Sequence, residues 1–105
     1  MNDDHGDDAY ALRLAIAHGL NQAQLRTIEF VVDVHERNDI APAVLRLSER
    51  GYECRVWDDP VDGSLSVYAA CTLYPTLEAI LAKEKEIRDA LIGLSISVED
   101  WGAAI

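Results

Sequence analysis

The sequence predicts a single α+β domain, and three observations lead to that class. The chain has 105 residues, which is enough for one hydrophobic core and too few for two. Half of its residues are hydrophobic and 27% are charged, which is typical of a globular protein and not of a disordered one. Segments with helical periodicity alternate with segments of period two. Helices and strands are therefore expected to share one core.

The N-terminal part is expected to contain an acidic segment and then a helix. Residues 1–7 are predicted to be a solvated terminus rather than a docking tail. Residues 8–20 are predicted to form a leading helix, because Asp8 can cap it, apolar residues recur at helical spacing and Gly19 can end it. This stretch is too short for a membrane span and contains Arg13. A cytoplasmic protein is expected.

Residues 24–105 are predicted to form the main domain, in the order strand, helix, strand, strand, helix, strand. Apolar and polar residues alternate in the first strand, and Pro42 and Gly51 mark the two ends of the helix that follows. Turn-forming residues join the second and third strands as an antiparallel hairpin. The mixed charges of the last helix, Glu84 among them, are expected to be its solvated face. The predicted segments are 24–34, 39–50, 52–57, 65–73, 75–92 and 95–101.

This order of elements predicts a ferredoxin-like sandwich. Both helices of the main domain would cover one face of a four-stranded antiparallel sheet. The opposite face would be too aromatic for a purely solvated surface, so either the leading helix or a partner covers it. For Trp57 and Trp101 both possibilities stay open. Strict alternation places on that face Glu29, Val31, Arg55, Trp57, Tyr68, Glu99 and Trp101.

The net charge restricts the classes of partner. Nine Lys and Arg against nineteen Asp and Glu give a formal charge of -10, which repels phosphate groups and opposes direct binding to nucleic acid. The same charge favours a basic patch on a protein, although acidity also serves solubility alone. A protein partner is expected, with no direct nucleic-acid or membrane contact. The residues predicted to contact it are Glu29, Trp57, Tyr68, Glu99, Asp100 and Trp101.

Residues suited to catalysis or metal binding are sparse. His35 beside Glu36 could be a base and its orienting acid, but a histidine in a turn is usually solvated. Cys54 and Cys71 lack the spacing of a zinc or redox site and are expected to be free thiols in the core, too far apart for a disulfide. No phosphate-binding, dinucleotide-binding or hydrolase motif occurs in the sequence. A protein without enzymatic activity, cofactor or metal is expected.

Four segments resemble the bacterial family of regulators of ribonuclease E activity B (RraB). They are LRTIEF at 25–30, LSERGYEC at 47–54, the cysteine-containing strand at 67–73, and VEDWG at 98–102. The segments occur in the family's order and spacing, and the leading helix matches as well. The resemblance implies a ferredoxin-like fold and a non-catalytic protein that binds ribonuclease E and slows or redirects RNA decay. The family's last strand usually reads Asp-Gly-Trp, where this chain has Glu-Asp-Trp.

A second hypothesis comes from the aromatic residues on the exposed sheet face. Such a face could form a homodimer or a small-ligand pocket in a regulatory domain unrelated to ribonucleases. The aromatic residues that motivate this alternative are Trp57, Tyr68 and Trp101. A monomer with both tryptophans buried would remove its main support.

Overall fold

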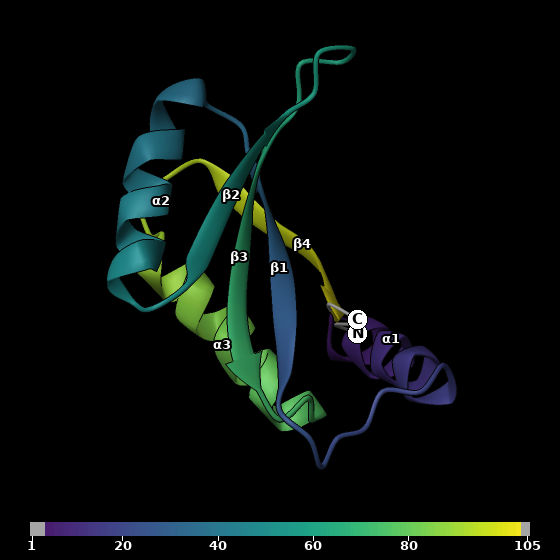
Figure 1. Cartoon of the computed structure of the whole chain (residues 1–105). Coiled ribbons are helices and arrows are strands. Elements are labelled where there is room, and N and C mark those ends of the chain that lie inside the picture. Colours follow the sequence, from purple (N-terminus) through teal and green to yellow (C-terminus); the bar gives the residue numbers. More distant parts are fainter. Residues whose placement is uncertain (1–3, 104–105) are drawn as a thin grey trace.

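The computed structural model describes residues 4–103, which form an α+β domain of three α-helices and an antiparallel sheet (Figure 1). The helices are α1 (Asp4–Ala17), α2 (Ile40–Glu49), which follows a 3-10 turn at Arg37–Asp39, and α3 (Leu77–Ala90). The strands are β1 (Arg26–Val34), β2 (Glu53–Asp58), β3 (Leu65–Leu73) and β4 (Ile96–Ala103), in the spatial order β2-β3-β1-β4. The predicted α+β class with an antiparallel sheet is confirmed.

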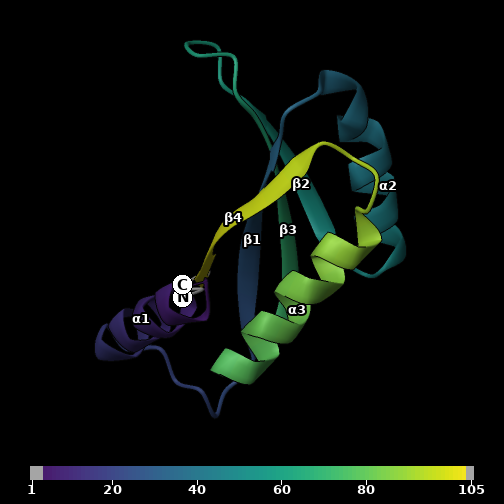
Figure 2. The same cartoon turned by 180° about the vertical axis from the view of Figure 1, so that it is seen from behind.

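The core lies between one face of this sheet and the helices. Alternate residues of β1 point into it, and Ile28, Phe30 and Val32 are fully buried, as the alternating pattern predicted. Leu47 of α2 and Ile87 of α3 belong to the same buried cluster. In Figure 1 the strands lie in front of α3, and in Figure 2 they lie behind it. The face of the sheet that is turned toward the viewer in Figure 1 carries no helix.

Helix α1 does not cover that face. It packs against α3 and lies beside the C-terminal end of β4 (Figure 2), with Leu12 in the main core. It begins at Asp4 rather than at the predicted Asp8, so part of the segment 1–7 that was predicted to be a solvated terminus is helical. Acidic residues at a helix N-terminus interact favourably with the helix dipole, which agrees with the earlier start. The first three residues lie outside the described part of the chain.

The ends of α2 and α3 are set by side-chain contacts. Thr76 caps α3 by accepting a hydrogen bond from the Ala79 backbone N–H at 3.1 Å, so the helix begins after Pro75 and not at it. Asp39 is the residue before α2, but its carboxylate accepts a hydrogen bond from the Ser95 backbone N–H at 2.8 Å. This bond ties the start of α2 to the segment that leads into β4. The Asp39 side chain thus joins two elements instead of capping one.

Glu84 contradicts the prediction that the charged run of α3 is solvated. Its exposed fraction is 5%, because it follows Ile80 by four residues and precedes Ile87 by three, so it lies on the buried stripe of the helix. The neighbouring residues of the run keep the expected surface position, for example Lys85, which pairs with Asp89 at 2.7 Å. The mixed-charge pattern correctly predicted a helix here, but the prediction that Glu84 is solvated was wrong.

A bulge in β4 overturns the strict alternation predicted for its C-terminal half. Val98 lies opposite Val32, but Asp100 lies opposite Val31, so one extra residue is inserted into β4 at position 99. Every side chain after the insertion changes face. Trp101 lies opposite the buried Phe30 and is itself 8% exposed, on the helix-covered side. The prediction that Trp101 belongs to the uncovered face is therefore wrong.

Candidate protein-binding surface

The uncovered sheet face, called the open face below, is acidic with a small aromatic component. Its members follow from the strand registers, since directly opposite residues point to the same side. Among the described side chains, this face has four carboxylates and one guanidinium. Its remaining positions are small, polar, aliphatic or aromatic. The members used below are Glu29, Val31 and Asp33 on β1, Glu53, Arg55 and Trp57 on β2, Ser66 and Tyr68 on β3, and Ser97 and Asp100 on β4.

Arg55 organises the centre of the open face. Its guanidinium donates three hydrogen bonds to the Glu29 carboxylate, at 2.9, 3.1 and 3.2 Å, and so connects β2 to β1 across the intervening β3. On the way it passes over the Tyr68 ring, with 4.8 Å from the guanidinium carbon to the ring centroid. The charges of Glu29 and Arg55 therefore neutralise each other. Tyr68 is held beneath a planar cation and is only partly exposed.

Three further carboxylates surround this centre. Glu53 and Asp100 are exposed at the two sides of the sheet, on β2 and β4. Asp33 is partly buried and accepts a hydrogen bond from the Ser66 hydroxyl at 3.1 Å. Trp57 lies on the edge strand opposite Ser66 and is 50% exposed. A partner on this face would meet a half-exposed indole and separate carboxylates, a combination suited to basic and to aromatic or aliphatic side chains.

The structure brings together four of the six residues predicted to contact a partner. Glu29, Trp57, Tyr68 and Asp100 share the open face, Trp101 is part of the core, and the side chain of Glu99 lies outside the described part. The contact set omitted Arg55, although its parity on β2 placed it beside Tyr68. The signal for its ion pair was that Arg55 and Glu29 have opposite charges and were predicted to lie on the same face of the sheet.

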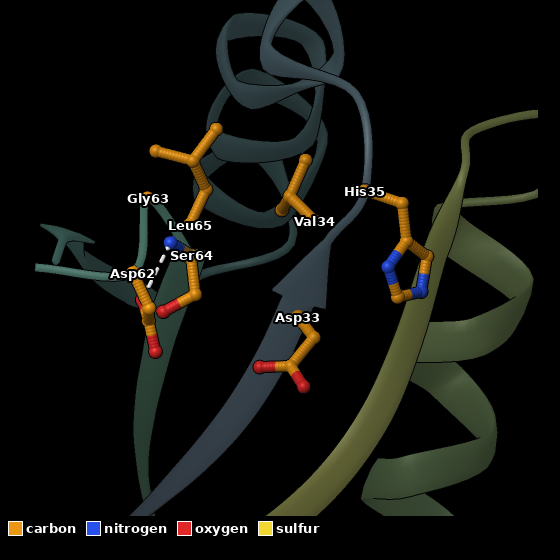
Figure 3. A pocket seen from close by; sticks show the side chains of 7 residues that line it. All are labelled: Asp33, Val34, His35, Asp62, Gly63, Ser64 and Leu65. Carbon is orange, nitrogen blue, oxygen red and sulfur yellow. Dashed lines mark hydrogen bonds between the residues drawn. The ribbon is translucent and has the colours of Figure 1, made fainter.

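A shallow pocket lies where β1 ends near the base of the β2–β3 hairpin (Figure 3). Asp33, Asp62 and His35 are its ionisable residues, and Figure 3 shows that they do not converge on one point. Asp62 accepts a hydrogen bond from the Ser64 backbone N–H at 2.8 Å, which holds the pKa of its carboxyl below the usual value. His35 turns toward β4, where its Nε2 lies 3.2 Å from the Ser97 hydroxyl. The predicted solvated histidine thus has a local structural contact.

The thiols lie on the other side of the sheet and are poor nucleophiles. Cys54 is opposite Ala69, two residues from Cys71 along β3, and both cysteines are free. Burial raises the pKa of each thiol, so each stays protonated at neutral pH. Nearby, burial and a hydrogen bond to Glu86 raise the pKa of the Tyr52 phenol. These groups belong to the packing between the sheet and its helices, since the Ser48 hydroxyl of α2 lies 3.9 Å from the Cys54 sulfur and Tyr52 bonds to Glu86 of α3.

Residues 4–103 were also compared with what a metal site and a membrane-spanning helix require. No group of three or more histidine, cysteine, aspartate or glutamate side chains in this part of the chain could hold a metal ion. Nor does this part contain a helix of the length and hydrophobicity that a bilayer crossing requires.

Comparison with protein families gives one match. The family described as regulator of ribonuclease activity B matches residues 5–103, a range that includes the whole sheet and nearly all of α1. No curated protein matches the chain.

Proposed function

The chain belongs to the RraB family of ribonuclease regulators, and from this premise we propose that it is a non-catalytic protein that binds an endoribonuclease of ribonuclease E type. Binding of the enzyme would slow or redirect RNA decay. The family match over residues 5–103 is the observation that carries this proposal. Because such an enzyme acts on cellular RNA, the proposal includes a cytoplasmic location.

The proposed contact surface is the open face. Its exposed carboxylates suit a basic region of the enzyme, and ribonucleases carry basic regions because they bind RNA. Trp57 is half exposed on the same face as these carboxylates, and tryptophan is enriched among the residues that dominate binding energy. The internally paired Glu29 and Arg55 would contribute shape rather than charge.

The same charges support a regulator that does not touch RNA. A chain of formal charge -10 repels phosphates, and the single guanidinium of the open face is already engaged by Glu29. Competition with RNA for a basic region of the enzyme is the mode of action that this charge distribution favours. The scattered ionisable groups of the pocket in Figure 3 favour no enzymatic activity.

The scaffold that we propose is ferredoxin-like. After α1 the elements follow the order β-α-β-β-α-β, and the strands lie in the order β2-β3-β1-β4 with antiparallel pairing throughout. Both features support the assignment. In this scaffold one sheet face is left without helices and is available to a partner.

The direct test is binding to the ribonuclease E-type enzyme purified from the native host. We expect a complex at low salt and slower cleavage of an RNA substrate when the chain is added. Glu53→Lys and Trp57→Ala should each weaken the complex by about tenfold or more, because a change of 1.4 kcal/mol in binding free energy is tenfold in affinity.

Glu49→Lys is the matched control. Glu49 is an exposed glutamate at the end of α2, so its substitution changes the net charge by the same amount as Glu53→Lys but away from the open face. Equal weakening by the two variants would show that only net charge matters and would refute the open face as the contact surface. Absence of any complex at low salt would refute the proposed function itself.

A further inference from the structure

We infer that β2 is a docking edge for a second copy of this chain, so that two copies pair β2 against β2 in antiparallel fashion about a two-fold axis at Val56. The inference does not depend on the proposed ribonuclease partner. It rests on the difference between the two edges of the sheet, the exposure of residues on β2, and the residues that face each other in the only favourable long register.

The two edge strands are protected to different degrees. β4 contains the bulge at position 99 and has α1 beside its C-terminal end, and both features block the addition of another strand (Figure 2). β2 pairs with β3 over all six residues without a register shift, and its sequence Glu-Cys-Arg-Val-Trp-Asp contains no proline. Its outer backbone groups therefore offer a straight row of donors and acceptors.

Apolar side chains are exposed on both sides of this edge. Val56 points to the helix-covered side and Trp57 to the open face, and each is 50% exposed. A charged side chain that projects from an edge strand normally opposes pairing with another chain. Here the central charge of β2, Arg55, is drawn back over Tyr68 to Glu29 and does not project beyond the edge.

The register follows from the pleat. In an antiparallel pair, directly opposite residues point to the same face. The two-fold axis must therefore lie midway between the two copies of one residue of β2, which is named below as the position of the axis. An axis at Arg55 would place the two Arg55 side chains opposite each other and each Val56 opposite the partner's Cys54, so the two exposed valines would not meet. An axis at Val56 places the two Val56 side chains together and each Trp57 opposite the partner's Arg55. The Trp57 ring can then pack on the aliphatic part of that arginine, whose guanidinium stays over Tyr68. This register uses five of the six residues of β2, those from Cys54 to Asp58.

The charge of the chain sets the salt dependence of this dimer. Each copy has a formal charge of -10, so the copies repel each other at long range, and added salt screens that repulsion. The contacts at the edge are backbone hydrogen bonds, Val56 packing and the packing of Trp57 on the aliphatic part of the partner's Arg55. Self-association should therefore strengthen as salt rises, whereas binding to a basic partner should weaken.

The dimer would place the two open faces side by side on one continuous sheet, because opposite residues share a face. If the open face is the ribonuclease contact, the dimer would offer two such contacts to one enzyme and gain affinity from bivalency. This consequence alone rests on the proposed function.

Sedimentation velocity over a range of protein and salt concentrations tests the inference. We expect the mass to rise from one chain to two with protein concentration, with the transition at lower concentration in high salt. Val56→Lys places two cations on the axis and should abolish the dimer. Leu14→Lys is the matched control, because Leu14 is 45% exposed on α1, beyond the opposite edge, and its substitution should leave the dimer intact.

Disulfide trapping gives a second readout that tolerates weak association. In a background of Cys54→Ser and Cys71→Ser, Val56→Cys should form a covalent dimer on oxidation, because facing residues of an antiparallel pair lie within disulfide reach. Val61→Cys at the hairpin tip is 93% exposed and should cross-link far less.

Three results would overturn the β2 dimer. One is a monomer at every concentration and salt, and another is equal cross-linking of the cysteines at positions 56 and 61. The third is a dimer that survives Val56→Lys and is lost with Tyr68→Lys, which would mean that the open faces pair with each other. None of these results decides whether the ribonuclease binds, since that binding is measured separately at low salt.

Discussion

Tyr52, just before β2, links the sheet to α3 through its hydroxyl group. The side chain is buried, its O–H donates a 2.6 Å hydrogen bond to the Glu86 carboxylate, and the Lys83 ammonium lies 5.7 Å from the ring centroid. Lys83 also pairs with Glu86 at 3.7 Å. The Tyr52 hydroxyl and the Lys83 ammonium thus share the Glu86 carboxylate, and the hydrogen bond from Tyr52 depends on the phenol keeping its proton.

Tyr52→Phe tests this dependence on the proton. Folding raises the pKa of Tyr52, so its stabilising effect is complete below the unfolded value of about 10 and is lost as pH rises above it. At neutral pH the variant should unfold about 1–2 kcal/mol more easily, because the hydrogen bond to a charged group is missing. Above pH of about 10 the difference should shrink.

Urea denaturation at neutral and alkaline pH measures both effects. Tyr74→Phe is the control, since Tyr74 is exposed and its substitution should change stability little at either pH. A difference between Tyr52→Phe and the natural chain that stays constant into the alkaline range would contradict the assignment of the proton to the Tyr52–Glu86 bond.

At the scale of elements, Arg46 joins α2 to the end of α3. Its Nη1 donates hydrogen bonds to the Ala90 carbonyl at 3.3 Å and to the Ile92 carbonyl at 2.8 Å. A cation at a helix C-terminus also interacts favourably with the helix dipole. Arg46→Ala should therefore lower the free energy of unfolding by about 1–2 kcal/mol in urea denaturation. Arg13→Ala on the exposed face of α1 should change it by less than about 0.5 kcal/mol, and equal effects of the two would refute the capping role.

Because of the β4 bulge, the two tryptophans are expected to contribute very differently to stability. Trp101 is buried with Phe30, so Trp101→Ala should cost about 3–5 kcal/mol of stability, while Trp57→Ala on the open face should cost less than about 1 kcal/mol. Trp101→Phe, which keeps most of the buried area, separates lost packing from failure to fold. Thermal denaturation of the three variants measures the order. A larger loss for Trp57→Ala than for Trp101→Ala would mean that strict alternation, without the bulge, describes β4.

The molecule as a whole has a charge that acts oppositely on its two proposed contacts. The affinity for a basic ribonuclease region should fall as salt rises from about 0.05 to 0.2 M, because the attraction between opposite charges is screened. Over the same range the dimer should become stronger, since like charges repel less. Titrations of both equilibria at matched salt concentrations make the comparison. Two equilibria that shift in the same direction would show that one of the two contacts is misassigned.

Local patterns were sufficient to locate most elements of the domain. The alternation in β1 correctly identified Ile28, Phe30 and Val32 as core residues. This strand lies between two others, so its side chains alternate regularly between the helix-covered face and the open face. The ends of α1 and α3 were less predictable. Several neighbouring polar residues could precede each of these helices. The sequence does not show that Thr76 caps α3 or that α1 starts as early as Asp4.

The candidate surface was predictable only in part. Glu29, Trp57 and Tyr68 lie on strands without bulges, so their faces followed from parity alone. Trp101 follows a bulge, so parity alone placed it on the wrong face. Glu84 lies at helical spacing from Ile80 and Ile87, so the spacing indicated its burial, whereas its charge indicated a solvated position. The pairing of Arg55 with Glu29 depends on the order of the strands, since the two residues lie on strands that are not neighbours.

The amino-acid sequence by itself determined the α+β class, the order of elements, the acidity and the family of this protein, because these follow from composition, periodicity and motif spacing along the chain. Only the tertiary structure decided that α1 packs against α3 beside the end of β4, that Trp101 enters the core and that β2 lies at an edge of the sheet. The physical reason is that strand register and helix packing are set by contacts between segments distant in sequence. One inserted residue in β4 then exchanges the faces of all residues that follow.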